Sequence, residues 1–115
     1  LMWEQADELD LTLVPGVFSP TEVHLAGARG AVKLFPAASL GPSYWRQLRG
    51  PMAPLPFCIA AGGLRPADLS AWFASGVDAV ALGSTLFDQQ DQLHAGHAEQ
   101  LEPYLHGITT SGETL

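Results

Sequence analysis

Four short apolar segments recur along the chain at intervals of about 20 to 25 residues, and a stretch of helical character follows each one. They occupy residues 11–14, 31–35, 56–61 and 78–82, and Gly or Pro closes every one of them. Apolar side chains occupy both alternating faces of these segments, which is typical of parallel strands covered on both sides. The repeat therefore predicts an α/β fold built from four βα units.

Helix-start residues support this repeat. Ser19, Pro20 and Glu22 predict a capping box, in which Ser19 is the N-cap, Pro20 takes the first helical position and Glu22 reaches back. We expect this helix to end near Gly27.

Further helices are expected between and after the later strands. Residues 41–48 predict one helix that Gly50 and Pro51 should end, and residues 66–76 predict another that closes at a glycine. In the polar C-terminal part of the chain, Pro103 is expected to interrupt a final helix.

The number of units limits the architecture. A closed barrel of parallel strands and helices needs eight βα units, so a sheet built from four has two exposed edges. Residues 1–10 resemble the end of a helix whose strand is missing, which favours a chain cut from a longer one. No linker divides the chain, so we expect residues 1–115 to be a single partial domain, half of a barrel, with a small open sheet as the alternative.

Charge and composition exclude several classes of function. With 12 acidic and 5 basic residues the net charge is −7, which opposes binding to nucleic acid or to anionic membranes. No apolar stretch is long enough to span a membrane and no signal peptide is visible, so a cytoplasmic protein is expected. The single cysteine, Cys58, lies in an apolar strand and is interpreted as a buried core thiol.

The only lysine, Lys33, lies within the second apolar segment. Strand alternation places Lys33 on one face with Ala31 and Phe35, and places Val32 and Leu34 on the opposite face. The branched pair should pack against helices, so Lys33 should point into the barrel interior. A lysine that loses water there becomes a neutral nucleophile suited to Schiff-base formation. The alternative is a strand lysine whose ammonium group simply reaches water.

Two small-residue turns follow the third and fourth strands. Gly62 and Gly63 form the first, and Gly83 and Ser84 belong to the second. Glycines let backbone N–H groups approach an anion, a helix N-terminus adds partial positive charge, and Ser84 can donate a further hydrogen bond. Together the turns predict a phosphate site, with ordinary tight turns as the alternative. Arg65 is expected to be solvent-exposed.

The remaining polar residues do not indicate a second site. Three histidines lack the spacing of a helical metal pair, so no metal site is expected: His94, His97 and His106. Three carboxylates are explained by helix caps or strand starts, so no general base is recognised: Glu22, Asp68 and Asp78.

The motif Val-Lys-Leu-Phe-Pro-Ala is followed by the motif at residues 40–44 and flanked by three other motifs in order. Together they resemble the class I aldolases of 2-keto-3-deoxy-6-phosphogluconate (KDPG) and 4-hydroxy-2-oxoglutarate. The matching motifs lie at residues 14–17, 32–37, 40–44, 61–63 and 82–84. The resemblance implies a (βα)8 TIM barrel, commonly a homotrimer, of which this chain supplies strands five to eight.

The same resemblance implies roles for individual residues. Lys33 matches the Schiff-base lysine. The residues implied in substrate binding are Pro15, Gly16, Phe35, Pro36 and Ala61, although turn formation is an alternative role for the prolines and Gly16. The residues implied in phosphate binding are Gly62, Gly63, Gly83 and Ser84.

Two departures from the family pattern matter. The family commonly has threonine where this chain has Ala61, and members acting on the galactonate epimer tend to carry a small apolar residue there. The substrate epimer, gluconate or galactonate type, therefore stays open. The family's general-base glutamate and carboxylate-binding arginine lie on early strands that this sequence does not contain, so we expect an incomplete catalytic site.

The implied reaction cleaves a phosphorylated 2-keto-3-deoxy sugar acid to pyruvate and glyceraldehyde 3-phosphate without a metal or other cofactor. Two alternative functions are compatible with the same sequence. One is a sugar-phosphate isomerase or epimerase that uses the same turns without an imine. The other is a non-catalytic half-barrel that assembles with another chain through its open sheet edges.

Overall fold

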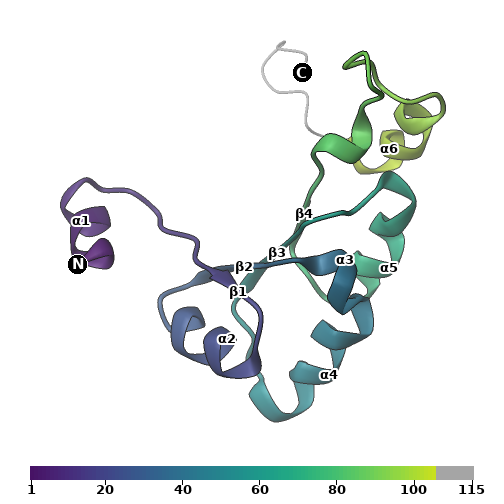
Figure 1. Ribbon diagram of the computed structural model, residues 1–115. Coiled ribbons are helices and arrows are strands. Elements are labelled where there is room, and N and C mark those ends of the chain that lie inside the picture. Colours follow the sequence, from purple (N-terminus) through teal and green to yellow (C-terminus); the bar gives the residue numbers. More distant parts are fainter. Residues whose placement is uncertain (106–115) are drawn as a thin grey trace.

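A four-stranded parallel sheet, with its strands in chain order, forms the centre of the molecule (Figure 1). This computed structural model describes residues 1–105, and His106 lies outside them. The strands are β1 (Gly16–Val17), β2 (Ala31–Leu34), β3 (Phe57–Ala61) and β4 (Ala79–Ala81). The helices are α1 (Met2–Glu8), α2 (Pro20–Gly27), α3 (Ala37–Leu40), α4 (Pro42–Met52), α5 (Leu69–Ala74) and α6 (His97–Leu105), with short 3-10 turns η1 (Pro66–Asp68) and η2 (Ser84–Leu86). The prediction of an α/β fold with parallel strands is confirmed.

The capping box at the start of α2 forms as predicted. The Glu22 N–H donates to Ser19 Oγ at 3.2 Å, and the Ser19 N–H donates to Glu22 Oε1 at 2.9 Å. The pKa of the Glu22 carboxyl lies below its ordinary value, mainly because the Ser19 backbone N–H donates a hydrogen bond to the carboxylate. The helix ends at Gly27, as expected.

One face of the sheet carries the hydrophobic core. Val32 and Leu34 of β2 are both fully buried, as are Cys58 and Ala60 of β3. Figure 1 shows α2, α4 and α5 together on one side of the strands. Their buried side chains complete the core, namely Val23, Trp45, Leu48, Leu69 and Trp72. The predicted alternation of β2 is therefore confirmed.

The opposite face of the sheet is uncovered within residues 1–105. Lys33 is exposed there, and on the same face Phe57 keeps 51% of its surface accessible. The expectation that both faces are covered therefore holds for only one face of the described chain. The N-terminal helix α1 lies away from the strands and does not cover them (Figure 1).

The first strand differs from its prediction. Residues 11–14 were expected to form it, but β1 begins at Gly16, which consequently lies within the strand and not after it. Pro15 has no N–H group to continue the ladder towards the N-terminus. The neighbouring strand also begins only at Ala31, directly after Gly30 with a φ of +126°, so earlier residues have no strand to pair with.

Helix boundaries differ where proline was expected to act as a stop. α4 continues through Gly50 and Pro51, because a proline in the last turn removes only one intrahelical hydrogen bond. Pro103 likewise lies inside α6. The segment expected as one helix over residues 66–76 starts as the 3-10 turn η1 before it becomes α5.

No helix among residues 1–105 has the length and apolar character needed to cross a membrane.

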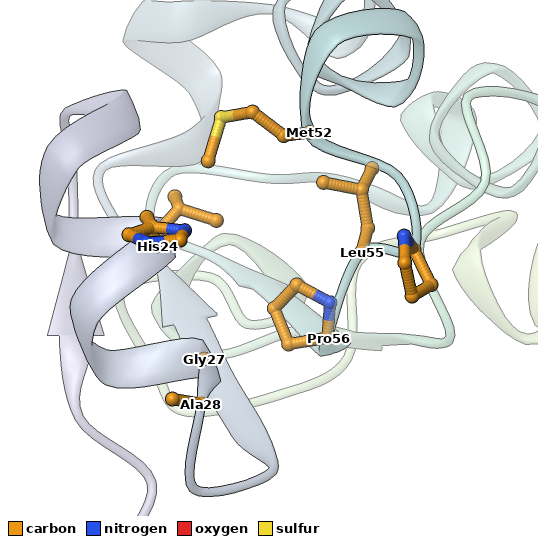
Figure 2. Close-up of a pocket in the computed structure, with 8 residues that line it drawn as sticks. His24, Gly27, Ala28, Met52, Leu55 and Pro56 are labelled. Carbon is orange, nitrogen blue, oxygen red and sulfur yellow. The ribbon is translucent and has the colours of Figure 1, made fainter.

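A pocket of about 370 Å³ lies between α2 and the segment that leads into β3 (Figure 2). Gly27, the last residue of α2, faces the ring of Pro56, which directly precedes β3. A Cβ atom at position 27 would lie 2.7 Å from Pro56 Cγ, so only glycine allows this close approach. Both residues lie at the amino ends of the strands, opposite to the end at which barrel enzymes bind substrate.

We expect Gly27→Ala to destabilise the protein by about 1–3 kcal/mol, because the rigid Pro56 ring cannot rotate away from the added methyl group. Gly50→Ala in α4 is the matched control, since no atom lies within 4 Å of a Cβ built there. Its gain in helix propensity is opposed by the following proline, so its effect should stay within about 0.5 kcal/mol. Urea unfolding measures both, and equal losses for the two variants would contradict the close contact.

Candidate functional site

Lys33 occupies the middle of the sheet and is held there by the backbone ladder. It pairs with Gly16 on β1 and with Ile59 on β3. Its N–H donates to the carbonyl of Pro15 at 2.8 Å. Because Val32 and Leu34 on either side point into the helix-facing core, the Lys33 side chain must point to the uncovered face.

Two of the predicted substrate-binding residues lie directly beside the Lys33 side chain. Lys33 Cε is 3.8 Å from the position that a Cβ would take at Gly16, so the lysine stem lies over the bare backbone of β1. Lys33 Nζ lies 5.2 Å from the centroid of the Phe35 ring, within the range of a cation–π contact. The Lys33 side chain thus lies between Gly16 of the adjacent strand β1 and Phe35, which directly follows β2.

The surroundings of Lys33 are small and apolar but open. The residues paired across the sheet at its level are Gly16, Ile59 and Ala79, which place no carboxylate next to the amine. Lys33 itself is exposed, so the loss of water expected from its apolar sequence context is not produced by residues 1–105. Desolvation of this amine requires a further group that covers the sheet face.

At the carboxyl ends of the strands, the turn after β2 packs tightly on the turn after β3. Gly62 has a φ of +104°, and a Cβ there would lie 2.8 Å from the Phe35 ring and 3.0 Å from Pro36 Cα. The Gly62 carbonyl accepts a hydrogen bond from the Ala38 N–H at 3.0 Å. Glycine is therefore required at position 62 both by its backbone conformation and by the close contact.

The four predicted phosphate-binding residues meet around one cavity of about 380 Å³. Gly62 and Gly63 come from the turn after β3, whereas Gly83 and Ser84 come from the turn after β4. Phe35 and Ala61 line the same cavity, and the remaining lining residues are Leu64, Ala81, Leu82 and Thr85. Lys33 is not part of the lining, and Phe35 connects it to the cavity.

Two other predicted residues lie apart from this cavity. Pro15 and Gly16 line a separate pocket of about 300 Å³ beside β1 and α2. A third predicted residue, Pro36, does not line the cavity, but its Cα lies 3.0 Å from the Cβ position of the lining residue Gly62. The structure thus divides the predicted substrate residues between two sides of Lys33.

Backbone amides are the available anion donors in the cavity. The N–H groups of Gly63 and Gly83 make no hydrogen bond within residues 1–105, and both residues are exposed. The expected contribution of an α-helix N-terminus after β4 is wrong, because the turn there is the single 3-10 turn η2. In the turn after β4, an anion would therefore meet individual N–H groups and the Ser84 hydroxyl and not a helix macrodipole.

A hydroxyl group that the sequence did not single out links the two turns. Thr85 Oγ1 donates to the backbone carbonyl of Leu64, and both residues line the cavity. The Ser84 hydroxyl, which the sequence did indicate, is exposed. Both hydroxyls follow Gly83 in the same short turn, and nothing in the sequence distinguishes their directions.

A second interaction between elements involves Tyr44, whose hydroxyl donates to the Phe18 carbonyl at 2.6 Å. Burial raises the pKa of the Tyr44 hydroxyl, and the nearby Glu22 carboxylate raises it further. This bond ties the turn after β1 to α4.

The carboxylates assigned to structural roles do occupy them. Asp68 Oδ2 accepts from the Arg65 N–H at 2.8 Å, and Asp78 Oδ2 accepts from the Cys58 N–H at 2.8 Å. Arg65 is exposed, as predicted. With Glu22 in the capping box, none of these three acids faces Lys33 as a general base.

The other reactive side chains are also accounted for. Burial raises the pKa of the Cys58 thiol to about 12, which confirms a core thiol and leaves it a poor nucleophile. The rings of His94 and His97 contact each other edge-on at 5.1 Å. No cluster of three or more metal-ligating side chains occurs among residues 1–105.

Comparison with known sequences points to one family. The family described as KDPG and KHG aldolase matches residues 2–103. The 2-dehydro-3-deoxy-6-phosphogalactonate aldolase of Escherichia coli (strain K12) is 33% identical over 79 residues, which are 67% of this chain and 38% of that protein. A probable 2-dehydro-3-deoxy-6-phosphogalactonate aldolase of Rhizobium meliloti (strain 1021) is 37% identical over 79 residues, 67% of this chain and 37% of its own length.

Solved structures give the same result. A structure described as native KDPGal superposes with a TM-score of 0.64 at 31% identity, covering 74% of this chain and 42% of that one. A cube-shaped, highly porous protein cage designed by fusing symmetric oligomeric domains superposes with a TM-score of 0.68 at 27% identity. The superposition covers 86% of this chain and 40% of that one. The chain therefore spans about two fifths of the length of each of these relatives.

We expect Gly62→Ala to destabilise the protein by about 1–3 kcal/mol, because the methyl group meets the Phe35 ring and the positive φ disfavours alanine. Gly83→Ala should cost less than about 1 kcal/mol, since nothing lies within 4 Å of its Cβ position. Thermal unfolding compares them. In a Phe35→Ala background the cost of Gly62→Ala should fall, and an unchanged cost would contradict the contact.

Proposed function

The chain belongs to the KDPG and KHG aldolase family, and we propose that Lys33 is the Schiff-base nucleophile of a class I aldolase. One observation carries this proposal above the others. The only lysine of the chain projects from mid-strand onto an uncovered sheet face, while both neighbours in the strand are buried on the other side. An isomerase that uses the same cavity without an imine would leave this placement without a purpose.

The proposed substrate is a 2-keto-3-deoxy-6-phospho sugar acid. The neutral amine of Lys33 attacks the C2 ketone, and loss of water leaves a protonated imine. A base removes the proton of the C4 hydroxyl, the C3–C4 bond breaks, and its electron pair passes into the imine to give an enamine. Glyceraldehyde 3-phosphate leaves, the enamine is protonated at C3, and hydrolysis of the imine releases pyruvate and regenerates Lys33. The chemistry requires neither a metal nor another cofactor.

The cavity next to Phe35 suits the phosphate end of such a substrate. The N–H groups of Gly63 and Gly83 are available, and the exposed Ser84 hydroxyl can donate as well. Gly62 supports the turn that presents them. Binding the phosphate here would orient the remote C3–C4 bond relative to the amine, which is how distal binding energy assists catalysis.

We assign the galactonate-type epimer as the preferred substrate. The two epimers differ at C4, the carbon whose hydroxyl must lose its proton. Ala61 lines the cavity without a hydroxyl group, and both curated relatives are named for the galactonate compound. Pro15, Gly16 and Pro36 complete the proposed substrate contacts around Lys33.

We further propose that residues 1–115 are one partial domain of a (βα)8 TIM barrel and form its strands five to eight. Two features support this proposal. Within residues 1–105 the outer strands β1 and β4 each have one unpaired edge, and the relatives extend over more than twice the matched length. Additional strands would cover Lys33, remove its water and supply the general base. A homotrimeric enzyme of the cytoplasm is the assembly and location we propose for the complete barrel.

Reduction with borohydride in the presence of pyruvate should trap a carboxyethyl group on Lys33 in the full-length protein that carries this chain. The imine is reduced to a stable secondary amine, which peptide mapping by mass spectrometry locates. Lys33→Arg keeps the positive charge but cannot form the imine, so it should abolish both the adduct and the cleavage activity. A folded full-length protein that gives no adduct at Lys33 would refute the aldolase proposal.

A further inference from the structure

We propose that Thr85 is a positioning residue that sets the separation of the two phosphate-binding turns. This inference rests on the proposed function, because it concerns how the same cavity holds its phosphate. Thr85 lies in η2, after β4, and its hydroxyl donates to the carbonyl of Leu64, after β3. Both residues line the cavity, so the bond joins one turn to the other at its wall.

The turns need such a connection because the sheet ladder ends before them. Ala61 and Ala81 are the last paired residues of β3 and β4. Beyond that pair, no backbone–backbone hydrogen bond joins residues 62–65 to residues 82–86, both of which lie within the described part of the chain. Both turns also contain glycine, which lets the backbone rotate freely. Without a side-chain bond, their spacing would vary.

The acceptor of this bond is a fixed point. Leu64 is only 2% exposed and belongs to the hydrophobic core, so its carbonyl is held by the buried side chain. The same turn is held from the other side by the hydrogen bond between the Ala38 N–H and the Gly62 carbonyl. The turn after β3 is thus anchored twice, and Thr85 ties the second turn to it.

The two neighbouring hydroxyls then have different tasks. The Thr85 proton is committed to Leu64 and is not available to a ligand. Ser84 is exposed and lines the same cavity, so its hydroxyl is the one that can reach a phosphate. Thr85 acts on the phosphate only through the positions of Ser84 and the Gly83 N–H group.

Thr85→Val and Thr85→Ser, made in the full-length protein, test the inference. Valine keeps the shape but removes the donor, whereas serine keeps the donor. We expect Thr85→Val to raise the KM for the phosphorylated keto acid and the inhibition constant of inorganic phosphate about fivefold, the effect of losing roughly 1 kcal/mol of a hydrogen bond. The rate of pyruvate trapping at Lys33, which involves no phosphate, should not change, and Thr85→Ser should behave as the wild type.

Two results would overturn the inference. One is a Thr85→Val protein with unchanged affinity for phosphate. The other is an equal loss in phosphate affinity and in pyruvate trapping, which would indicate general damage to the fold. Failure of the proposed function looks different, since wild-type protein would then give no adduct with pyruvate. Thermal unfolding of each variant identifies any protein that is not folded.

Discussion

The direction of Lys33 depends on the two-residue repeat of β2. Val32 and Leu34 are fully buried against the helices, so the residue between them has to face the other way. A shift of one residue in register would bury an unpaired ammonium group among Trp45 and Cys58, at a cost of several kcal/mol per ion. The burial of Val32 and Leu34 in the core therefore also fixes the outward direction of Lys33.

Parallel strand order then decides what lies near the lysine. Because β2, β3 and β4 run in the same direction, the turns that follow them lie together at the carboxyl ends of the strands. Phe35, Gly62 and Ser84 meet there, although they are far apart in the sequence. The opposite end of the strands holds the close contact between Gly27 and Pro56. The candidate site and this close contact thus lie at opposite ends of the same strands, the arrangement that (βα)8 barrels show for their active sites and their stabilising contacts.

Features set by local sequence were predictable. The capping box of Ser19 and Glu22 and the inside–outside pattern of β2 follow from spacing alone, and both form as predicted. Features set by distant partners were not. The short β1 depends on where β2 begins, and the continuation of α4 past Pro51 depends on how little a proline disturbs the last turn. These were errors of boundary and did not change the type of element.

The candidate site likewise has some features that local motifs predict and others that depend on distant partners. Motifs indicated Gly62, Gly63, Gly83 and Ser84, and the structure places all four around one cavity. Thr85 could not be identified from the sequence, because its hydrogen bond to Leu64 forms only when two turns come together in the fold. The expected desolvation of Lys33 depends on groups that cover the sheet face, and residues 1–105 leave that face open. A crystal structure of the full-length protein soaked with pyruvate, without reductant, tests the central claim most directly. We predict continuous density between Lys33 Nζ and C2 of pyruvate on a sheet face that further strands enclose. Pyruvate bound elsewhere, with Lys33 facing open solvent, would contradict it.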